Sequence, residues 1–164
     1  AITKFWWDVE RSTNKALDTG KMQTAGRLKI GYYDHKLFIC LPSGRKLAYI
    51  EPEKRLNSFN RMELTYMGVG KTRKWERIMT YGPKLVENCI QAIARDILAE
   101  AMLRVDATGF DIVAHVHDEM IVEVPNGKSS VKELCDMMAE SPDWVDDKLP
   151  LRADGYECEW YRKD

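Results

Sequence analysis

One stretch of the chain, Lys84–Val105, continues for about six helical turns without a glycine or a proline. Most of its residues are alanine or apolar, and its polar residues recur at helical spacing. A helix that is apolar on two flanks is buried between other layers and shows solvent only narrow polar strips. The sequence therefore predicts a long helix that is packed inside a mixed core of helices and strands.

The polar residues of this predicted helix fall into two stripes. At 100° per residue, the first stripe contains Lys84, Glu87, Asn88, Gln91 and Arg95. The second stripe lies opposite, at Asp96, Glu100 and Arg104. The cations and amides of the first stripe can bind phosphates and minor-groove base acceptors, which makes this face a candidate DNA-binding surface. Periodicity alone favours an ordinary solvated strip, and Glu87 would repel phosphate.

A second informative segment, residues 112–124, reads IVAHVHDEMIVEV. Its two arms, residues 112–116 and 120–124, are apolar and β-branched, which predicts paired strands joined by a tight turn at His117, Asp118 and Glu119. This turn contains none of the glycine, asparagine or proline that hairpin loops favour. Adjacent carboxylates beside apolar strands repel each other, and such departures from local rules are typical of functional sites. A Mg²⁺ ion would relieve the repulsion, because it prefers oxygen ligands.

Two other interpretations of the turn compete with the metal-binding one. The turn can be a solvated polar loop without function, and the local pattern leaves that possibility open. The order His115-Val116-His117 also begins a zinc-hydrolase motif of the HxHxDH kind. However, Glu119 and Met120 stand where that motif has aspartate and histidine, so the sequence argues against zinc.

Shorter predicted elements surround these two segments. They are a helix over 3–19 ended by Gly20, strands at 28–33, 36–41 and 46–50, a strand pair at 62–67 and 73–79, a helix opened by the capping box Ser130–Glu133, and a half-buried strand at 149–160. The consecutive strands with short turns indicate an antiparallel meander. The sequence therefore predicts an α+β fold, an antiparallel sheet with packed helices, in one unit over residues 1–164.

Charge and composition narrow the class of protein. The 164 residues include 25 Lys and Arg against 26 Asp and Glu, a formal net charge of -1, which excludes a strongly basic nucleic-acid-binding protein but permits a local basic face. No apolar run approaches the ~20 residues that cross a membrane, so we expect no membrane partner. The four cysteines form no CxxC pair and indicate reduced core thiols in a cytoplasmic compartment.

Two segments follow each other across a short turn: TYGPKLVENCIQAIARDILAEAML (80–103) and VAHVHDEMIVEVP (113–125). Together they closely resemble the C-terminal palm of family A DNA polymerases, especially the bacteriophage type, in which a long palm helix leads into the motif C hairpin with its His-Asp-Glu core. Outer segments resemble phage-type polymerases too: FWWDVE (5–10), LPSGRKLAY (41–49), SPDW (141–144) and PLRADGYECEWYRKD (150–164). The resemblance covers essentially the whole chain, and it implies a palm-like sheet over 26–164 preceded by the end of a fingers-like helical segment over 1–25.

The resemblance also implies roles for individual residues in the turn. Asp118 matches the motif C aspartate that binds the catalytic Mg²⁺ ions, and Glu119 matches the second motif C carboxylate. His117 matches the histidine near the primer terminus. These three residues are the candidate catalytic residues, and the two carboxylates are the candidate metal ligands.

On the long helix, Gln91 lines up with a palm-helix glutamine that contacts the minor groove of the primer-template. Lys84, Asn88 and Arg95 are further candidates for contacts with DNA. The implied partners are primer-template DNA, deoxynucleoside triphosphates and an N-terminal polymerase portion. The implied location is the cytoplasm of a bacterial host, in a protein encoded by a phage or prophage.

Two motifs of the family are not found in these residues. Motif A, of the D-Y-S-x-x-E type, supplies the other metal-binding aspartate, and no D-Y-S occurs here. Lys74, Tyr81 and Gly82 imitate motif B, but their spacing is one residue short. We therefore expect a C-terminal fragment of a larger polymerase that carries half of a two-metal site and is inactive alone. The alternative is a non-catalytic DNA-binding remnant or accessory domain.

Overall fold

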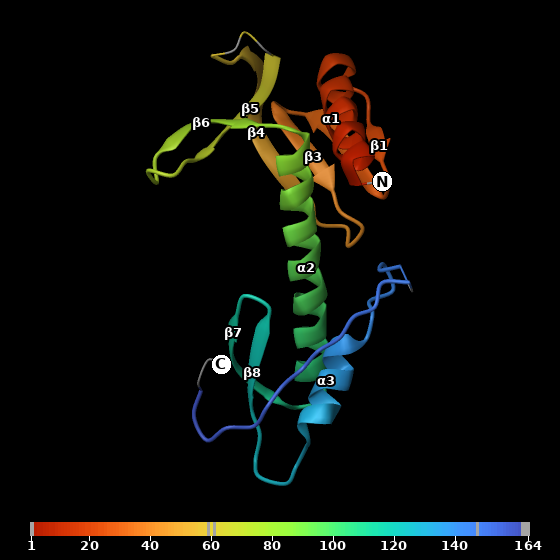
Figure 1. Ribbon diagram of the computed structural model, residues 1–164, viewed down its shortest axis with the longest axis vertical. Helices are drawn as coiled ribbons and strands as arrows, with labels where there is room; N and C mark the ends of the chain where they lie inside the picture. Colours follow the sequence, from red (N-terminus) through yellow and green to blue (C-terminus); the bar gives the residue numbers. More distant parts are fainter. Residues whose placement is uncertain (1, 59, 61, 147, 162–164) are drawn as a thin grey trace. The chain divides into compact units, whose positions relative to one another are not determined.

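The computed structural model describes residues 2–58, 60, 62–146 and 148–161. Within these residues it is an α+β protein, as the sequence predicts, with three helices and eight strands (Figure 1). In chain order they are α1 (Ile2–Thr19), β1 (Gln23–Ala25), β2 (Leu28–Tyr33), β3 (Lys36–Cys40), β4 (Lys46–Leu56), β5 (Met62–Val69), β6 (Trp75–Thr80), α2 (Gly82–Ala107), β7 (Asp111–Val116), β8 (Glu119–Glu123) and α3 (Val131–Ala139). None of the described helices is long and apolar enough to cross a membrane.

The chain divides into two compact units, Ala1–Ile93 and Ala94–Asp164, where we expected one unit over 1–164. The division falls within α2. Each unit is described by itself.

Unit 1 is built on a six-stranded sheet in the order β1 to β6, and every neighbouring pair is antiparallel. This arrangement confirms the predicted meander and the predicted strand pair. Strand β4 continues past its predicted end at Ile50 to Leu56 although it contains Pro52. The register shifts between Ile50 and Glu53, and such an irregularity is where a strand tolerates proline.

Helix α1 packs on the sheet and supplies Val9 and Ala16 to the core, together with Ile30, Leu37 and other sheet residues. The helix ends as predicted at Gly20, which adopts a left-handed φ of 64° and donates its N–H to the Ala16 carbonyl at 2.9 Å. A glycine in this conformation is the commonest way to end a helix.

The first half of α2 completes the core of unit 1 through Leu85, Val86, Cys89 and Ala92. The helix begins at Gly82, two residues before the predicted start, because Pro83 is tolerated in a first helical turn. The Gly82 N–H donates to the Glu10 carboxylate at 2.7 Å, and a Cβ atom at this position would lie 2.5 Å from the Trp6 carbonyl oxygen. Glycine is therefore needed for the close approach of α1 to the start of α2.

The Tyr49 hydroxyl and the Cys89 thiol are weak acids that are buried in this core. Their burial should make the protein less stable at alkaline pH. Burial raises the pKa of Tyr49 to about 12 and the pKa of Cys89 to about 11. The unfolded chain ionises these groups first, so the contribution of each is complete below its unfolded pKa and is lost as pH rises through the folded pKa. We expect the free energy of unfolding to fall by about 2 to 3 kcal/mol for each group. Urea unfolding at increasing pH measures this fall.

Two tyrosine variants distinguish the ionisation of the buried Tyr49 from other effects of alkaline pH on stability. Tyr49→Phe should remove the decrease in the free energy of unfolding that occurs as pH rises above the ordinary tyrosine pKa. Tyr33→Phe, at a side chain that is 78% exposed, should leave the pH profile as it is. Identical profiles for wild type and Tyr49→Phe would contradict the assignment.

Unit 2 contains the second half of α2, the β7–β8 hairpin, α3 and the residues that follow it. Among the described residues of this unit, the buried apolar ones are few: Leu98, Ala101, Val105, Pro142 and Val145. Helix α3 starts as predicted, because the Ser130 hydroxyl accepts the Glu133 N–H at 3.2 Å.

Polar contacts from the second stripe of α2 connect the parts of unit 2. The Trp144 indole N–H donates to Glu100 at 2.6 Å, and Arg104 donates to the Met137 carbonyl at 2.5 Å. The predicted strand at 149–160 is wrong: the described residues there form no strand, and Tyr156 and Trp160 are exposed. An alternating pattern becomes a strand only beside a partner, and the sheet of unit 2 contains only β7 and β8 among the residues described.

Candidate functional site

The turn between β7 and β8 contains two residues, His117 and Asp118, rather than the three that the sequence predicts. Glu119 is the first residue of β8 and pairs with Val116. His117 adopts a left-handed φ of 53° at the first loop position, where two-residue hairpins favour glycine or asparagine. A non-glycine residue in this region costs free energy, which is typical of a position chosen for its side chain.

The two candidate metal ligands differ in their surroundings. Both side chains are exposed. Glu119 Oε2 accepts a hydrogen bond from the Tyr161 hydroxyl at 3.3 Å. Among the described residues, no hydrogen bond or ion pair engages the carboxylate of Asp118. Asp118 therefore presents both of its oxygens to solvent, whereas one oxygen of Glu119 is already in use.

Tyr161 is a neighbour of the site that sequence reasoning missed. Desolvation and, after it, the negative charge of Glu119 raise the pKa of Tyr161 above its ordinary value. The contact joins residues that lie 42 positions apart in the chain. No local pattern indicates such a contact, and Tyr161 lies just after the strand predicted at 149–160.

The side chains of the turn are of a kind that suits Mg²⁺ better than zinc. Two carboxylates are the protein ligands that Mg²⁺ commonly takes, with water and substrate phosphates completing its shell. No group of three or more His, Cys, Asp or Glu side chains among the described residues is arranged to hold a metal. The Arg95 guanidinium lies 3.2 Å from His115 Nε2, and this cation opposes a zinc ion at that histidine.

Arg95, in unit 2, is the candidate DNA-binding residue that reaches strand β7. Its guanidinium nitrogens lie 3.4 Å from Nδ1 and 3.2 Å from Nε2 of His115, and both side chains are exposed. The contact holds the guanidinium against the strand that leads into the carboxylate turn.

The other candidate DNA-binding residues belong to unit 1. Lys84 and Gln91 are exposed, and both donate to Glu87 Oε1, at 2.9 Å and 3.4 Å. The hydrogen bond to Glu87 raises the pKa of Lys84. Asn88 is partly buried and donates its amide to the Tyr49 hydroxyl at 3.2 Å. Glu87 therefore accepts hydrogen bonds from two of the candidates, Lys84 and Gln91. The amide of Asn88 instead donates to a residue of the core of unit 1.

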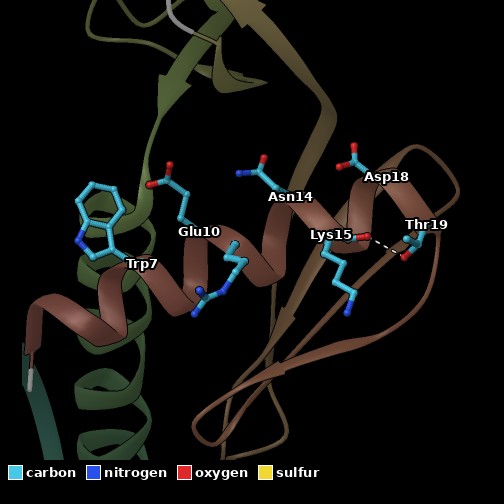
Figure 2. Close-up of a pocket in the computed structure, with 7 residues that line it drawn as sticks. Trp7, Glu10, Asn14, Lys15, Asp18 and Thr19 are labelled. Carbon is cyan, nitrogen blue, oxygen red and sulfur yellow. Dashed lines mark hydrogen bonds between the residues drawn. The ribbon is translucent and has the colours of Figure 1, made fainter.

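One hollow among the described residues of unit 1 lies along α1. It has a volume of about 560 Å³. Figure 2 shows Glu10, Asn14 and Asp18 following one another along one side of this helix, with Trp7 nearby. Glu10 holds the Gly82 N–H and Asp18 pairs with Lys54 at 2.6 Å, so its carboxylates are used to hold unit 1 together. The hollow contains none of the candidate site residues.

Comparison with known proteins gives one informative match. No protein-family model matches the chain, and no solved structure matches it significantly. The DNA polymerase of Bacillus phage SP02 is 44% identical over 165 residues, an alignment that covers 99% of this chain and 25% of that polymerase. The chain is thus similar, over nearly its whole length, to about one quarter of a phage DNA polymerase.

Proposed function

We propose that the chain is part of a template-directed DNA polymerase, which transfers nucleotides to a primer 3′-hydroxyl during DNA replication. The single observation that carries the proposal is the 44% identity to a phage DNA polymerase over 99% of this chain. In this proposal residues 26–164 form a palm-like region with motif C, and residues 1–25 form the end of a fingers-like segment. The partners are primer-template DNA and deoxynucleoside triphosphates, in the cytoplasm of a bacterial host.

The proposed chemistry places Asp118 and Glu119 as ligands of catalytic Mg²⁺. The bound ions would activate the primer hydroxyl and stabilise the leaving pyrophosphate. Asp118, with both oxygens accessible, would be the principal ligand in this chain. Glu119 would contribute its remaining oxygen while Tyr161 holds the other. His117 would lie near the primer terminus.

The second metal-binding aspartate, that of motif A, would come from polymerase residues outside these 164. The chain spans a quarter of the polymerase that it resembles, which leaves room for such residues. A second candidate function is a DNA-binding remnant or accessory domain without catalysis, because DNA binding would need only the exposed polar side chains of α2 and no complete metal site.

A primer-extension assay separates the two candidates. We expect no extension by the 164 residues alone and Mg²⁺-dependent extension by the complete gene product that contains them. Extension by the 164 residues alone, lost in Asp118→Ala, would show that the metal site is complete in this chain. DNA binding without extension by the complete gene product would favour the remnant.

Binding of Mg²⁺ to the turn should be weak without nucleotide. We expect a dissociation constant on the order of millimolar, because Mg²⁺ sheds its water reluctantly and finds only two carboxylates here. Asp118→Asn should abolish the binding, and Asp111→Asn, at the far end of the same hairpin, should leave it unchanged. Titration calorimetry measures both. Equal loss in the two variants would indicate general charge attraction instead of a site.

Contacts of α2 with duplex DNA should appear in the salt dependence of binding. Arg95→Ala should lower the slope of log affinity against log salt by about 1, since each neutralised phosphate contributes ~0.9. Gln91→Ala should weaken binding with little change in slope, because an amide contacts base acceptors without releasing a counterion. Fluorescence anisotropy with a labelled primer-template measures both effects. Lys132→Ala, at a lysine already paired with Asp136, is the control, and a slope change equal to that of Arg95→Ala would contradict the assignment.

A further inference from the structure

The tip of the β5–β6 hairpin, residues 69–76, is a basic exposed turn of unit 1. It carries Lys71, Arg73 and Lys74 against the single carboxylate of Glu76, a net charge of 3 - 1 = +2 in a chain whose net charge is -1. All four side chains are exposed. Among the described residues, no ion pair neutralises any of the three cations. In contrast, the next arginine in the sequence, Arg77, forms ion pairs with Glu51 and Glu53.

Backbone hydrogen bonds support the conformation of this tip. The Gly70 N–H donates to the Lys74 carbonyl at 2.9 Å, and the Arg73 N–H donates to the Gly70 carbonyl at 3.0 Å. Arg73 adopts a left-handed φ of 60°, where a turn favours glycine or asparagine. The hairpin belongs to the edge of the sheet, and it projects away from the other strands of unit 1 (Figure 1). The turn therefore holds three cations outward at some cost in backbone energy.

An exposed aromatic side chain stands next to these cations. Trp75 is 60% exposed and directly follows Lys74. It pairs across the hairpin with Val69, which is 63% exposed. Proteins bind unpaired nucleotides with solvent-exposed aromatic rings that stack on bases, together with nearby cations that contact the phosphates. The tip offers both kinds of side chain within residues 71–75.

A second turn of the same sheet contains a lysine that is neutralised by a neighbouring carboxylate. At the β2–β3 turn, Lys36 pairs with Asp34 at 2.8 Å, and this hydrogen bond lowers the pKa of Asp34. The β5–β6 tip has no equivalent pair among the described residues.

We propose that the β5–β6 tip is a binding site for single-stranded DNA, in which Lys71, Arg73 and Lys74 contact backbone phosphates and Trp75 stacks on an unpaired base. The three cations and the ring identify a nucleic-acid strand as the ligand, and the choice of DNA rests on the proposed function. An unpaired template strand has this chemistry. The site uses none of the residues of the carboxylate turn.

The test uses the complete gene product and a labelled oligothymidine, with binding followed by anisotropy at several salt concentrations. The triple variant K71A/R73A/K74A should lower the salt slope by about 2, since single strands release ~0.7 counterion per phosphate. Trp75→Ala should weaken binding by about 5- to 100-fold without changing the slope, and Trp75→Phe should restore most of it. Lys36→Ala is the matched control and should change neither quantity.

Several outcomes would overturn the inference. They are an unchanged slope in the triple variant, a change equal to that of Lys36→Ala, or a loss restricted to duplex DNA with no effect of Trp75→Ala. Thermal unfolding of each variant identifies any loss of DNA binding that comes from misfolding. If the triple variant misfolds, the salt slopes of the single variants Lys71→Gln and Lys74→Gln test the inference instead, and unchanged slopes in both would overturn it. Asp118→Asn should leave binding at the tip intact. Strand binding at the tip without primer extension would contradict the proposed function alone, and extension without strand binding at the tip would contradict this inference alone.

Discussion

Asp118→Asn in the complete gene product should reduce primer extension by at least about 10³-fold, because metal ions at such sites contribute several kcal/mol to the transition state and 1.36 kcal/mol corresponds to a factor of ten. The substitution keeps the shape of the side chain and removes its charge. The carboxylate is exposed and has no partner among the described residues, so the folded state loses no contact with it. Removing the repulsion between Asp118 and Glu119 should leave thermal stability unchanged or slightly higher.

The combination of lost activity and retained stability is what distinguishes a catalytic carboxylate from a structural one. Steady-state extension rates and thermal unfolding of the same preparation measure the two quantities. Asp111→Asn, an equally exposed carboxylate in the same hairpin, should leave both near wild type. A clear loss of stability in Asp118→Asn would favour the structural interpretation of the turn.

The second large effect concerns the core of unit 1. Leu85→Ala should lower the free energy of unfolding by about 2 to 5 kcal/mol, because it removes a fully buried side chain and leaves a cavity. Leu85 has no exposed surface and lies in the core formed by α1, the sheet and the first half of α2.

The same helix supplies the control for this prediction. Ile90 is 59% exposed, and Ile90→Ala should change the free energy of unfolding by less than about 0.5 kcal/mol. Urea denaturation of the wild type and of the two variants measures the difference. Equal effects at the two positions would contradict the packing described for α2.

Much of the fold follows from signals that act within a few residues. Gly20 ends α1, Ser130 opens α3, and the short turns of the meander separate strands whose buried positions alternate. The long uninterrupted segment predicts α2, and the structure extends it by two residues at each end. These features depend on backbone chemistry that a neighbouring element does not alter.

The sequence-based predictions fail where the structure of a segment depends on the element that packs or pairs with it. Strand β1, with three residues, is too short to show a period and exists because it pairs with β2. The tail has the alternation of a strand, but the described residues offer it no strand to pair with. The long helix was expected to be apolar because it is enclosed on two flanks, yet Ile90 and Leu103 are 59% and 70% exposed. Periodicity identifies an apolar face and cannot show what covers it.

In the candidate site, too, the local features are predicted from the sequence and the contacts between distant residues are not. The sequence predicts the hairpin and its carboxylates, because a charged turn between β-branched arms is a local pattern. It does not predict that Glu119 belongs to the strand, where it pairs with Val116 across the two-residue turn. Nor does it predict that the Glu119 carboxylate meets Tyr161, because these residues lie 42 positions apart in the chain. Nor does it predict that the amide of Asn88 is held by Tyr49.

Template-directed incorporation by the complete gene product tests the central claim most directly. The measurement extends a labelled primer on four templates that differ only in the first unpaired base, with Mg²⁺ and one deoxynucleoside triphosphate at a time. The account predicts that only the complementary nucleotide is added efficiently on each template, and that omission of Mg²⁺ or the substitution Asp118→Asn removes the addition. Addition that ignores the template base, or that persists in Asp118→Asn, would contradict it.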